Sequence, residues 1–209
     1  MGKLFLGAQS TEPTPSAGMA VAYVDSVTKK LVVKNDAGFI DGYINNFSTA
    51  SQAPAAATRT YITGSAIAIP TNKLQIGTCF RWHFNITKTA AGTAASTYDI
   101  AVGTAGTTAD TARVSFTKPA GTAAADQGTI IIMAICRGPL SASGVFAGDF
   151  SLTHNLSATG HAVIPCVNVS TISGAFDVTT ANLIVGVCIT SGASDAITIQ
   201  MVQAEAWNL

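Results

Sequence analysis

The sequence predicts an all-β protein whose larger part is a β-sandwich or jelly roll. Strand-like apolar runs recur at regular intervals from residue 60 to residue 207, and turn-forming Gly, Thr, Ala and Asp residues separate them. Within several runs, apolar and polar residues alternate with period two, as in a strand that has one buried face. Nothing between the runs has a helical pattern, so a sandwich is favoured over βαβ units.

The first 18 residues predict an extended arm. They are polar and turn-rich, and Pro13 and Pro15 favour extended or polyproline geometry. Leu4, Phe5 and Leu6 are apolar and are hard to justify in solvent. We therefore expect the arm to become ordered against a partner protein, and a disordered tail is the alternative.

A small β-ribbon and a linker follow the arm. Residues 45–59 are rich in Ser, Thr and Ala and have no amphipathic stripe, which indicates a linker. The predicted domains are residues 1–58, which hold the arm, ribbon and linker, and residues 59–209, which form the sandwich. The short strands of the ribbon are expected at residues 20–24, 31–34 and 39–44.

The sandwich strands show which side chains face the core. Phe80, Trp82, Phe84 and Ile86 share one face of a strand and predict its buried side. Near the C-terminus the alternation slips in phase, which a β-bulge would absorb. The predicted strands are residues 61–69, 75–87, 98–102, 112–116, 129–137, 145–154, 161–169, 183–190 and 196–207.

The run at residues 129–136 is expected to be the most deeply buried strand. Its residues Ile130, Ile131, Ile132 and Met133 are apolar on both faces. A strand tolerates this pattern when a second sheet or another subunit covers each side. Together with the scarcity of charge, this run predicts a homotrimer closed around a three-fold axis.

Composition narrows the classes of partner. Charged residues make up 11% of the 209 residues, hydrophobic residues make up 48%, and the mean hydropathy is +0.39. So little charge predicts that much of the surface contacts other protein. With 11 Lys and Arg residues against 11 Asp and Glu residues, the net charge is +0, and no basic footprint for nucleic acid exists. No apolar run approaches the ~18 residues that span a bilayer, and the first residues lack a signal-peptide pattern, so we expect synthesis in the cytoplasm and no membrane partner.

A search for chemical groupings predicts no catalytic, cofactor-binding or metal-binding residues, and hence no enzyme. His154 and His161 flank one predicted hairpin turn and could approach each other, but that turn offers no carboxylate to complete a metal site. The Gly- and Thr-rich loop at residues 103–110 lacks the Lys and the helix of a phosphate-binding loop. The isolated aspartates are expected to cap turns, and the four separated cysteines, which lie in apolar runs, to be buried free thiols.

Several stretches resemble virion proteins of tailed bacteriophages. The pattern at residues 13–18, 22–24 and 30–38 resembles a segment in which a ribbon precedes a trimeric β domain. The stretches TYITGSAIAIP (residues 60–70), residues 74–117 and TAAADQGTI (residues 122–130) resemble head-decoration and fibre-like proteins with a jelly-roll domain. The resemblance implies a tumour-necrosis-factor-like jelly roll and a structural role in the virion.

Two functions agree with this resemblance. The first is a decoration, or cement, protein that binds the major capsid protein lattice as a trimer on the outer surface of the virion and stabilises the head. Its expected capsid contacts are Leu4, Phe5, Leu6, Pro13 and Pro15 in the arm. The alternative is a tail or head fibre that binds a host receptor or surface glycan.

Overall fold

A computed structural model describes residues 8–9, 13–14, 16–17, 19–26, 31–35, 43–69, 71, 73–156, 158–163, 166–170, 172–194 and 196–209. All the regular secondary-structure elements in this part of the chain are β-strands, which confirms the predicted all-β class. The described residues accordingly hold no helix that could cross a membrane. The chain divides into two compact units, Met1–Tyr43 with Leu209, and Ile44–Asn208.

The first unit contains a small three-stranded sheet. β1 (Ala8–Gln9) lies parallel to β2 (Ala20–Asp25), and β2 pairs antiparallel with β3 (Leu31–Asn35). β2 and β3 confirm the first two strands of the predicted ribbon. Most of the third predicted strand falls on residues outside the described ranges.

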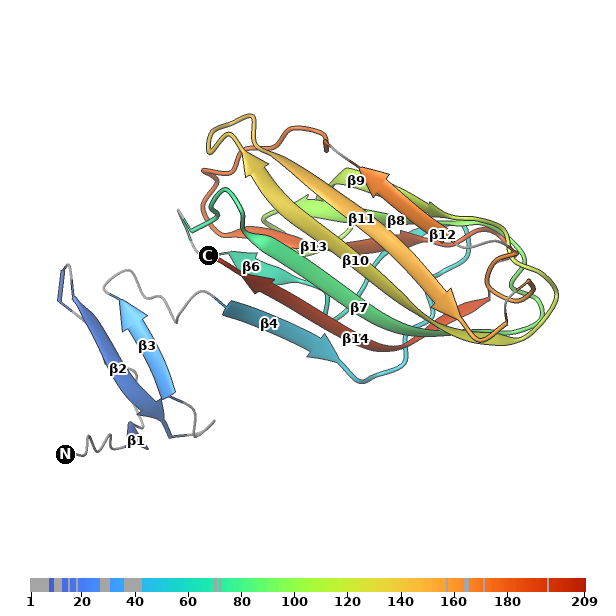
Figure 1. Cartoon of the computed structure of the whole chain (residues 1–209), viewed down its shortest axis with the longest axis horizontal. Coiled ribbons are helices and arrows are strands. Elements are labelled where there is room, and N and C mark those ends of the chain that lie inside the picture. Colours follow the sequence, from blue (N-terminus) through green and yellow to red (C-terminus); the bar gives the residue numbers. More distant parts are fainter. Residues whose placement is uncertain are drawn as a thin grey trace. The chain divides into compact units, whose positions relative to one another are not determined.

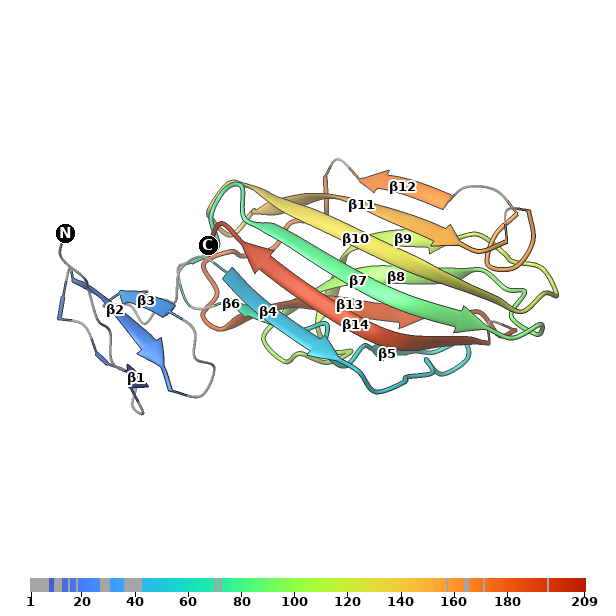
Figure 2. The same cartoon turned by 60° about the horizontal axis from the view of Figure 1, so that its bottom comes forward.

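The second unit is a sandwich of two β-sheets, which Figure 2 shows as two layers. One sheet has six strands in the order β12-β11-β10-β7-β14-β4 and faces the viewer in Figure 1. The other has the order β5-β13-β8-β9, and β6 also pairs with β13. The strands are β4 (Tyr43–Ser48), β5 (Arg59–Tyr61), β6 (Ile67–Ile69), β7 (Cys79–Lys88), β8 (Ser96–Gly103), β9 (Thr111–Lys118), β10 (Asp126–Gly138), β11 (Val145–His154), β12 (Cys166–Ser170), β13 (Leu183–Thr190) and β14 (Ile197–Trp207).

The strand order is that of a jelly roll. Because β5 and β6 both pair with β13, they act as two pieces of one strand. If the hairpin β11–β12 is left out and β5 and β6 count as one strand, eight strands remain, numbered from β4 as the first to β14 as the eighth. In these numbers the sheet β4-β14-β7-β10 has the order 1-8-3-6, and the sheet β5-β13-β8-β9 has the order 2-7-4-5, as in a jelly roll. β11 and β12 extend the first of these sheets beyond β10. The predicted β-sandwich is therefore confirmed.

The aromatic residues of β7 occupy the core, as their alternation predicts. Phe80, Trp82 and Phe84 are fully buried, whereas His83 between them is half-buried on the opposite face. The rings of Phe80 and Trp82 stack with centroids 5.7 Å apart. The Trp82 Nε1–H donates a hydrogen bond to the Ser65 carbonyl oxygen at 2.8 Å, so its one polar group is satisfied in the core.

The predicted bulge near the C-terminus is present in β14. The register with β7 shifts between Ile199 and Met201, so Gln200 has no partner across the ladder. After the bulge, Val202, Ala204 and Ala206 point into the core. Because of the bulge, the apolar residues that follow it point into the core again, and the polar Gln200 points outward.

The segment predicted as a linker belongs to the sandwich. β4 pairs with β14, Gln52 forms a bridge with Ile199, and Ala56 forms one with Ser191. The compact units divide between Tyr43 and Ile44, whereas the sequence predicts a linker at residues 45–59. The sequence did not predict this pairing, because β4 is an edge strand that supplies few core residues and because Gln52 and Ala56 pair through the backbone.

Candidate functional site

The arm residues predicted to bind the capsid lie largely outside the described part of the chain. Leu4, Phe5, Leu6 and Pro15 are in the ranges that the structure does not describe. Pro13 is described, and its side chain is partly exposed. The capsid-binding role of these residues therefore stays a prediction.

The four apolar residues of β10 divide between the two faces of the six-stranded sheet. Ile130 and Ile132 are fully buried between the sheets. Ile131 and Met133 lie on the outer face, which is turned away from the second sheet, and both are half-buried. The second sheet therefore covers one side of β10, as predicted, and in the single chain the other side remains open.

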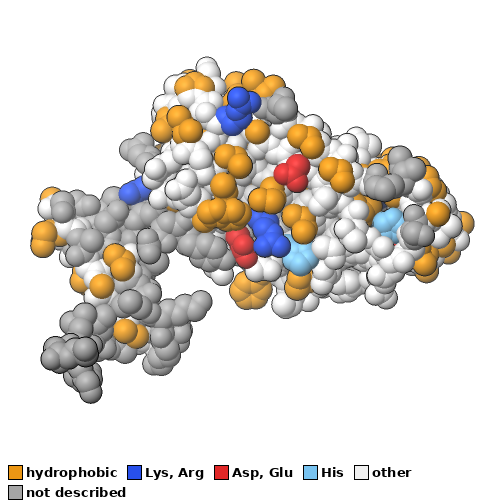
Figure 3. Space-filling view, viewed as in Figure 1, with side chains coloured by type: hydrophobic (Ala, Val, Ile, Leu, Met, Phe, Trp, Pro, Cys, Tyr) orange, Lys and Arg blue, Asp and Glu red, His pale blue; other side chains and the backbone are white. Residues whose placement is uncertain are grey.

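Apolar side chains continue across that outer face. Ile135 on β10 is 43% exposed, and Val167 and Val169 on β12 are 66% and 72% exposed. We define the apolar face as Ile131, Met133, Ile135, Val167 and Val169. Figure 3 looks onto this side of the sandwich and shows hydrophobic side chains spread over it, with several acidic and basic side chains among them.

The apolar face contains a shallow groove of about 300 Å³. Met133 and Ile135 form one wall, Val169 forms the other, and the small Ala147 of β11 lies between them. Asp149 also lines the groove. A contiguous apolar surface that is rimmed by polar residues is typical of a protein–protein contact.

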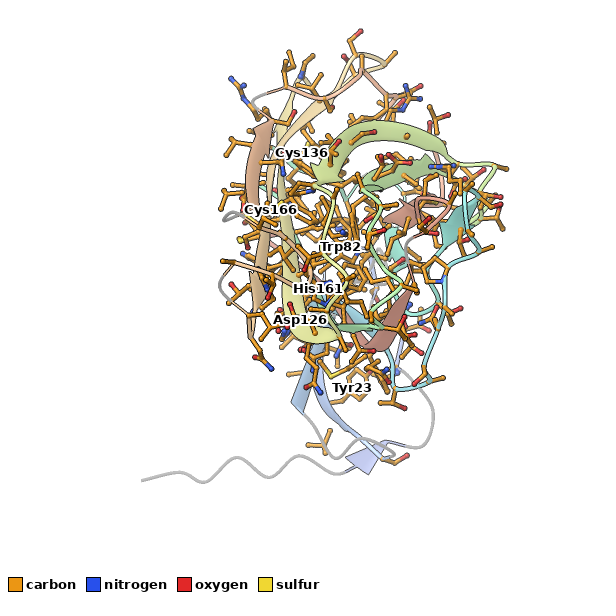
Figure 4. The ribbon with its side chains drawn as sticks, turned by 90° about the vertical axis from the view of Figure 1, so that its right-hand side faces the viewer. Tyr23, Trp82, Asp126, Cys136, His161 and Cys166 are labelled. Atoms are coloured by element: carbon orange, nitrogen blue, oxygen red, sulfur yellow. The ribbon has the colours of Figure 1, made fainter. Side chains whose placement is uncertain are left out.

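A cluster of ionisable side chains lies where the loops meet at one end of the sandwich. We define the loop cluster as Lys88, Lys118, Asp126, His154 and His161. The two histidines approach each other as predicted, with ring centroids 6.2 Å apart and the rings edge to face. Figure 4 shows Asp126 close to His161.

Asp126 is the centre of the loop cluster. Its carboxylate accepts hydrogen bonds from the backbone N–H groups of His161, at 2.9 Å, and Gln127, at 2.8 Å, and lies 2.7 Å from His154 Nδ1. Burial raises the pKa of Asp126, but these three hydrogen bonds outweigh it, so the pKa lies below its ordinary value. Asp126 is thus a carboxylate that joins β10 to the β11–β12 loop.

His161 is fully buried, and its ring has no hydrogen-bond partner among the described residues. The pKa of His161 is lowered from 6.5 to about 4, mainly by burial; the Asp126 carboxylate acts in the opposite direction, and the charges of Lys118, His154 and Lys88 add to the lowering. The ring is therefore neutral at neutral pH.

The two lysines of the cluster connect three loops through hydrogen bonds to backbone carbonyl oxygens. Lys88 Nζ donates to the carbonyl oxygens of Thr89, Thr122 and Ala124 at 3.1, 2.8 and 2.5 Å. Lys118 Nζ donates to carbonyl oxygens of the β7–β8, β9–β10 and β11–β12 loops, on Ala94, Pro119 and His161. Both side chains are almost completely buried, at 4% and 0% exposure. The backbone supplies the acceptors that a buried ammonium needs.

The loop cluster has a structural role, because its buried side chains hold the surrounding loops together. The carboxylate and both ammonium groups are held by backbone groups, and the neutral His161 is shielded from solvent. Among the described residues, no three His, Cys, Asp or Glu side chains are placed to hold a metal ion. Sequence reasoning placed the two histidines together but missed Asp126, because its position depends on strand pairing between distant segments.

The loop that follows β8 uses several of its backbone amides internally. The Asp110 carboxylate accepts hydrogen bonds from the N–H groups of Ala105 and Gly106 at 3.0 and 2.8 Å. Arg59 donates to the carbonyl oxygens of Thr108 and Asp110 and forms an ion pair with Asp99 at 3.0 Å. The loop is a self-capped turn, as predicted. All four cysteines are free, as predicted, and Cys136, Cys166 and Cys188 are buried, whereas Cys79 is only half-buried.

Comparisons with known proteins give one weak likeness. No protein-family model matches the chain, and no curated protein matches it. A solved structure, the CBM2 module of Lactobacillus casei BL23 phage J-1 evolved Dit, is similar with 10% sequence identity and a TM-score of 0.32. The match covers 75% of this chain and 76% of that one. A similarity this low assigns no function to this chain.

Proposed function

We propose that this chain is a structural protein of a tailed-phage virion, a decoration protein that binds the major capsid protein lattice as a homotrimer and stabilises the head. The observation that carries the proposal is the apolar face. Val167 and Val169 are largely exposed in the single chain. Only 11% of all residues are charged, so little charge is present to keep such a surface solvated. Contact with further copies of the chain would remove this surface from water.

A closed trimer suits the shape of this surface. The apolar face lies on β10 and β12, toward one edge of the six-stranded sheet, where neighbouring subunits could each cover part of the next. Closed rotational symmetry repeats one such contact without leaving an unpaired face. In this proposal the virion surface is the site of action, the host cytoplasm is the site of synthesis, and neither nucleic acid nor a membrane is a partner.

The N-terminal arm supplies the contact with the capsid. A segment such as Leu4, Phe5 and Leu6 with nearby prolines suits an extended chain laid over another protein. Ordering such a segment costs entropy, and three arms on one trimer raise the effective concentration at adjacent capsid sites. Weak single contacts would then become strong together.

The test mixes undecorated capsids with the full chain or with a chain that lacks residues 1–18. We expect the full chain to occupy the capsids and to raise the temperature at which they release DNA, and the shortened chain to occupy them far less. Light scattering of both proteins checks that each forms the same oligomer. Equal occupancy by the shortened chain would exclude the arm as the anchor.

The fibre alternative gives a different result in the same experiment. A fibre would leave capsids unoccupied and would bind isolated tails or host cells. Fluorescently labelled full chain, incubated in parallel with capsids, tails and host cells, separates the two functions directly.

A further inference from the structure

The outer face of the six-stranded sheet ends, beyond the apolar face, in a hollow whose exposed polar side chains are uncharged. We define the amide groove as Asn85, Thr87, Gln127, Thr129, Asn155 and Gln200. It comprises two adjoining hollows of about 310 and 350 Å³, which share Thr87, Gln127 and Asn155. The groove thus draws its polar side chains from three strands and from the chain just after β11.

The pairing of the strands explains why these side chains meet. Asn85 lies opposite Thr129, and Thr87 lies opposite Gln127, in the antiparallel ladder of β7 and β10. The β14 bulge adds Gln200, whose Nε2 donates to Thr87 Oγ1 at 3.0 Å. Without the bulge, a residue at this place in the ladder would keep the alternation of its neighbours.

The chemistry of the groove fits hydroxyl groups. A carboxamide offers two donors and an acceptor, and a sugar hydroxyl is both donor and acceptor. The side chains of Gln127 and Asn155 form no hydrogen bond with any described residue, so both are available to a ligand. Their backbones are fixed, since the Asn155 N–H donates to the Gln127 carbonyl oxygen at 3.0 Å.

Among the described residues that line the groove, none offers an accessible charge to an ionic ligand. Lys88 and Asp126 line its floor, but both are buried, and backbone groups bind the ammonium and the carboxylate from within the loop cluster. A phosphate, a sulfated sugar or a peptide carboxylate would therefore lose its hydration without meeting an exposed counter-charge. A neutral polyol loses less.

We propose that the amide groove binds a neutral saccharide. The residues that line the two hollows include the aliphatic Ile86 and Leu156 and no aromatic ring, so the affinity of one groove is expected to be millimolar. The groove residues lie at the end of β7 and the start of β10. Figure 1 shows these strand ends at the end of the sandwich opposite the start of β4. Saccharide binding there does not depend on the proposed capsid binding.

The experiment measures saccharide binding by saturation-transfer difference NMR, which detects millimolar ligands of large proteins. The probes are cellotetraose, maltotetraose and chitotetraose as neutral saccharides, and sialyllactose as an anionic one, each titrated into the full chain. We expect at least one neutral probe to bind and sialyllactose to give no stronger signal. Gln127→Ala and Asn155→Ala should each weaken the binding about five- to tenfold.

The matched control is Gln203→Ala, which removes an exposed amide from β14 on the same face but outside the groove. It should leave the affinity unchanged. The proposal is overturned if no neutral probe binds, if Gln203→Ala weakens binding as much as the groove variants do, or if sialyllactose binds best. Capsid occupancy of the Gln127→Ala, Asn155→Ala double variant separates the two proposals: it should equal that of the unmodified chain, and its loss would make the groove a capsid contact instead.

Discussion

At the scale of single residues, His161 links the stability of the sandwich to pH. Its folded pKa of about 4 lies below the ordinary value of 6.5, so between these values the unfolded chain binds a proton that the folded chain does not. The free energy of unfolding should therefore fall by up to about 1.4 kcal/mol per pH unit as the pH drops from 6.5 to 4, roughly 3 kcal/mol in all. Asp126, whose pKa is lowered, adds a further loss only below its ordinary value of 3.8.

Urea unfolding of the full chain and of His161→Leu at pH 7, 5.5 and 4 measures this effect. The variant should be as stable as the full chain at pH 7, because neither ring nitrogen has a partner among the described residues, and its stability should decline less in acid. Parallel pH profiles for the two proteins would show that His161 does not titrate as described.

The ammonium of Lys88 should stabilise the same loops. Lys88→Met leaves the carbonyl oxygens of Thr89, Thr122 and Ala124 without this donor in a buried site. We expect a loss of about 3 kcal/mol in the free energy of unfolding. Arg81→Met, at a half-buried residue of β7 outside the loop cluster, is the control and should cost much less. Equal losses in thermal or urea unfolding would contradict the role of the carbonyl ligands.

At the scale of strands, alternation in the sequence predicted the elements but not their neighbours. The buried face of β7 could be predicted because Phe80, Trp82 and Phe84 recur with period two and nothing else competes for the core. The role of β4 could not, because an edge strand needs only backbone pairing to join a sheet. Asp126 was missed for a related reason: its contact with His154 depends on the register between β10 and β11, which no local pattern encodes.

The place of β4 leads to a prediction about shortened chains. A fragment that begins at Ile44 should fold with the thermal stability of the sandwich, because it keeps all of β4 except Tyr43 and keeps the bridges of Gln52 and Ala56. A fragment that begins at Thr60 exposes the edge of β14 and should melt at a lower temperature or aggregate. Circular dichroism melting curves compare the two. If both fragments melt together, β4 contributes nothing to the sandwich.

At the scale of the whole molecule, the apolar face predicts how the trimer can be dissociated. Val169→Glu places a charge on a side chain that is 72% exposed in the single chain, so folding should be little affected. Burying that charge between subunits is costly, and we expect the mass measured by light scattering to fall from that of a trimer to that of a monomer. Val163→Glu, at an exposed position outside the apolar face, should remain trimeric. A monomeric unmodified chain at micromolar concentration would exclude the trimer itself.

The burial of Lys88 and Lys118 has a consequence for covalent labelling. Residues 44–208 contain three lysines, and in the folded sandwich only Lys73 is more than marginally exposed. An amine-reactive dye should therefore attach within the sandwich at Lys73 alone, and mass spectrometry of the digested protein would place the label on one peptide. Dye that reaches Lys88 or Lys118 would report that the loops have opened, so the labelling pattern becomes a probe of opening at the far end of the sandwich.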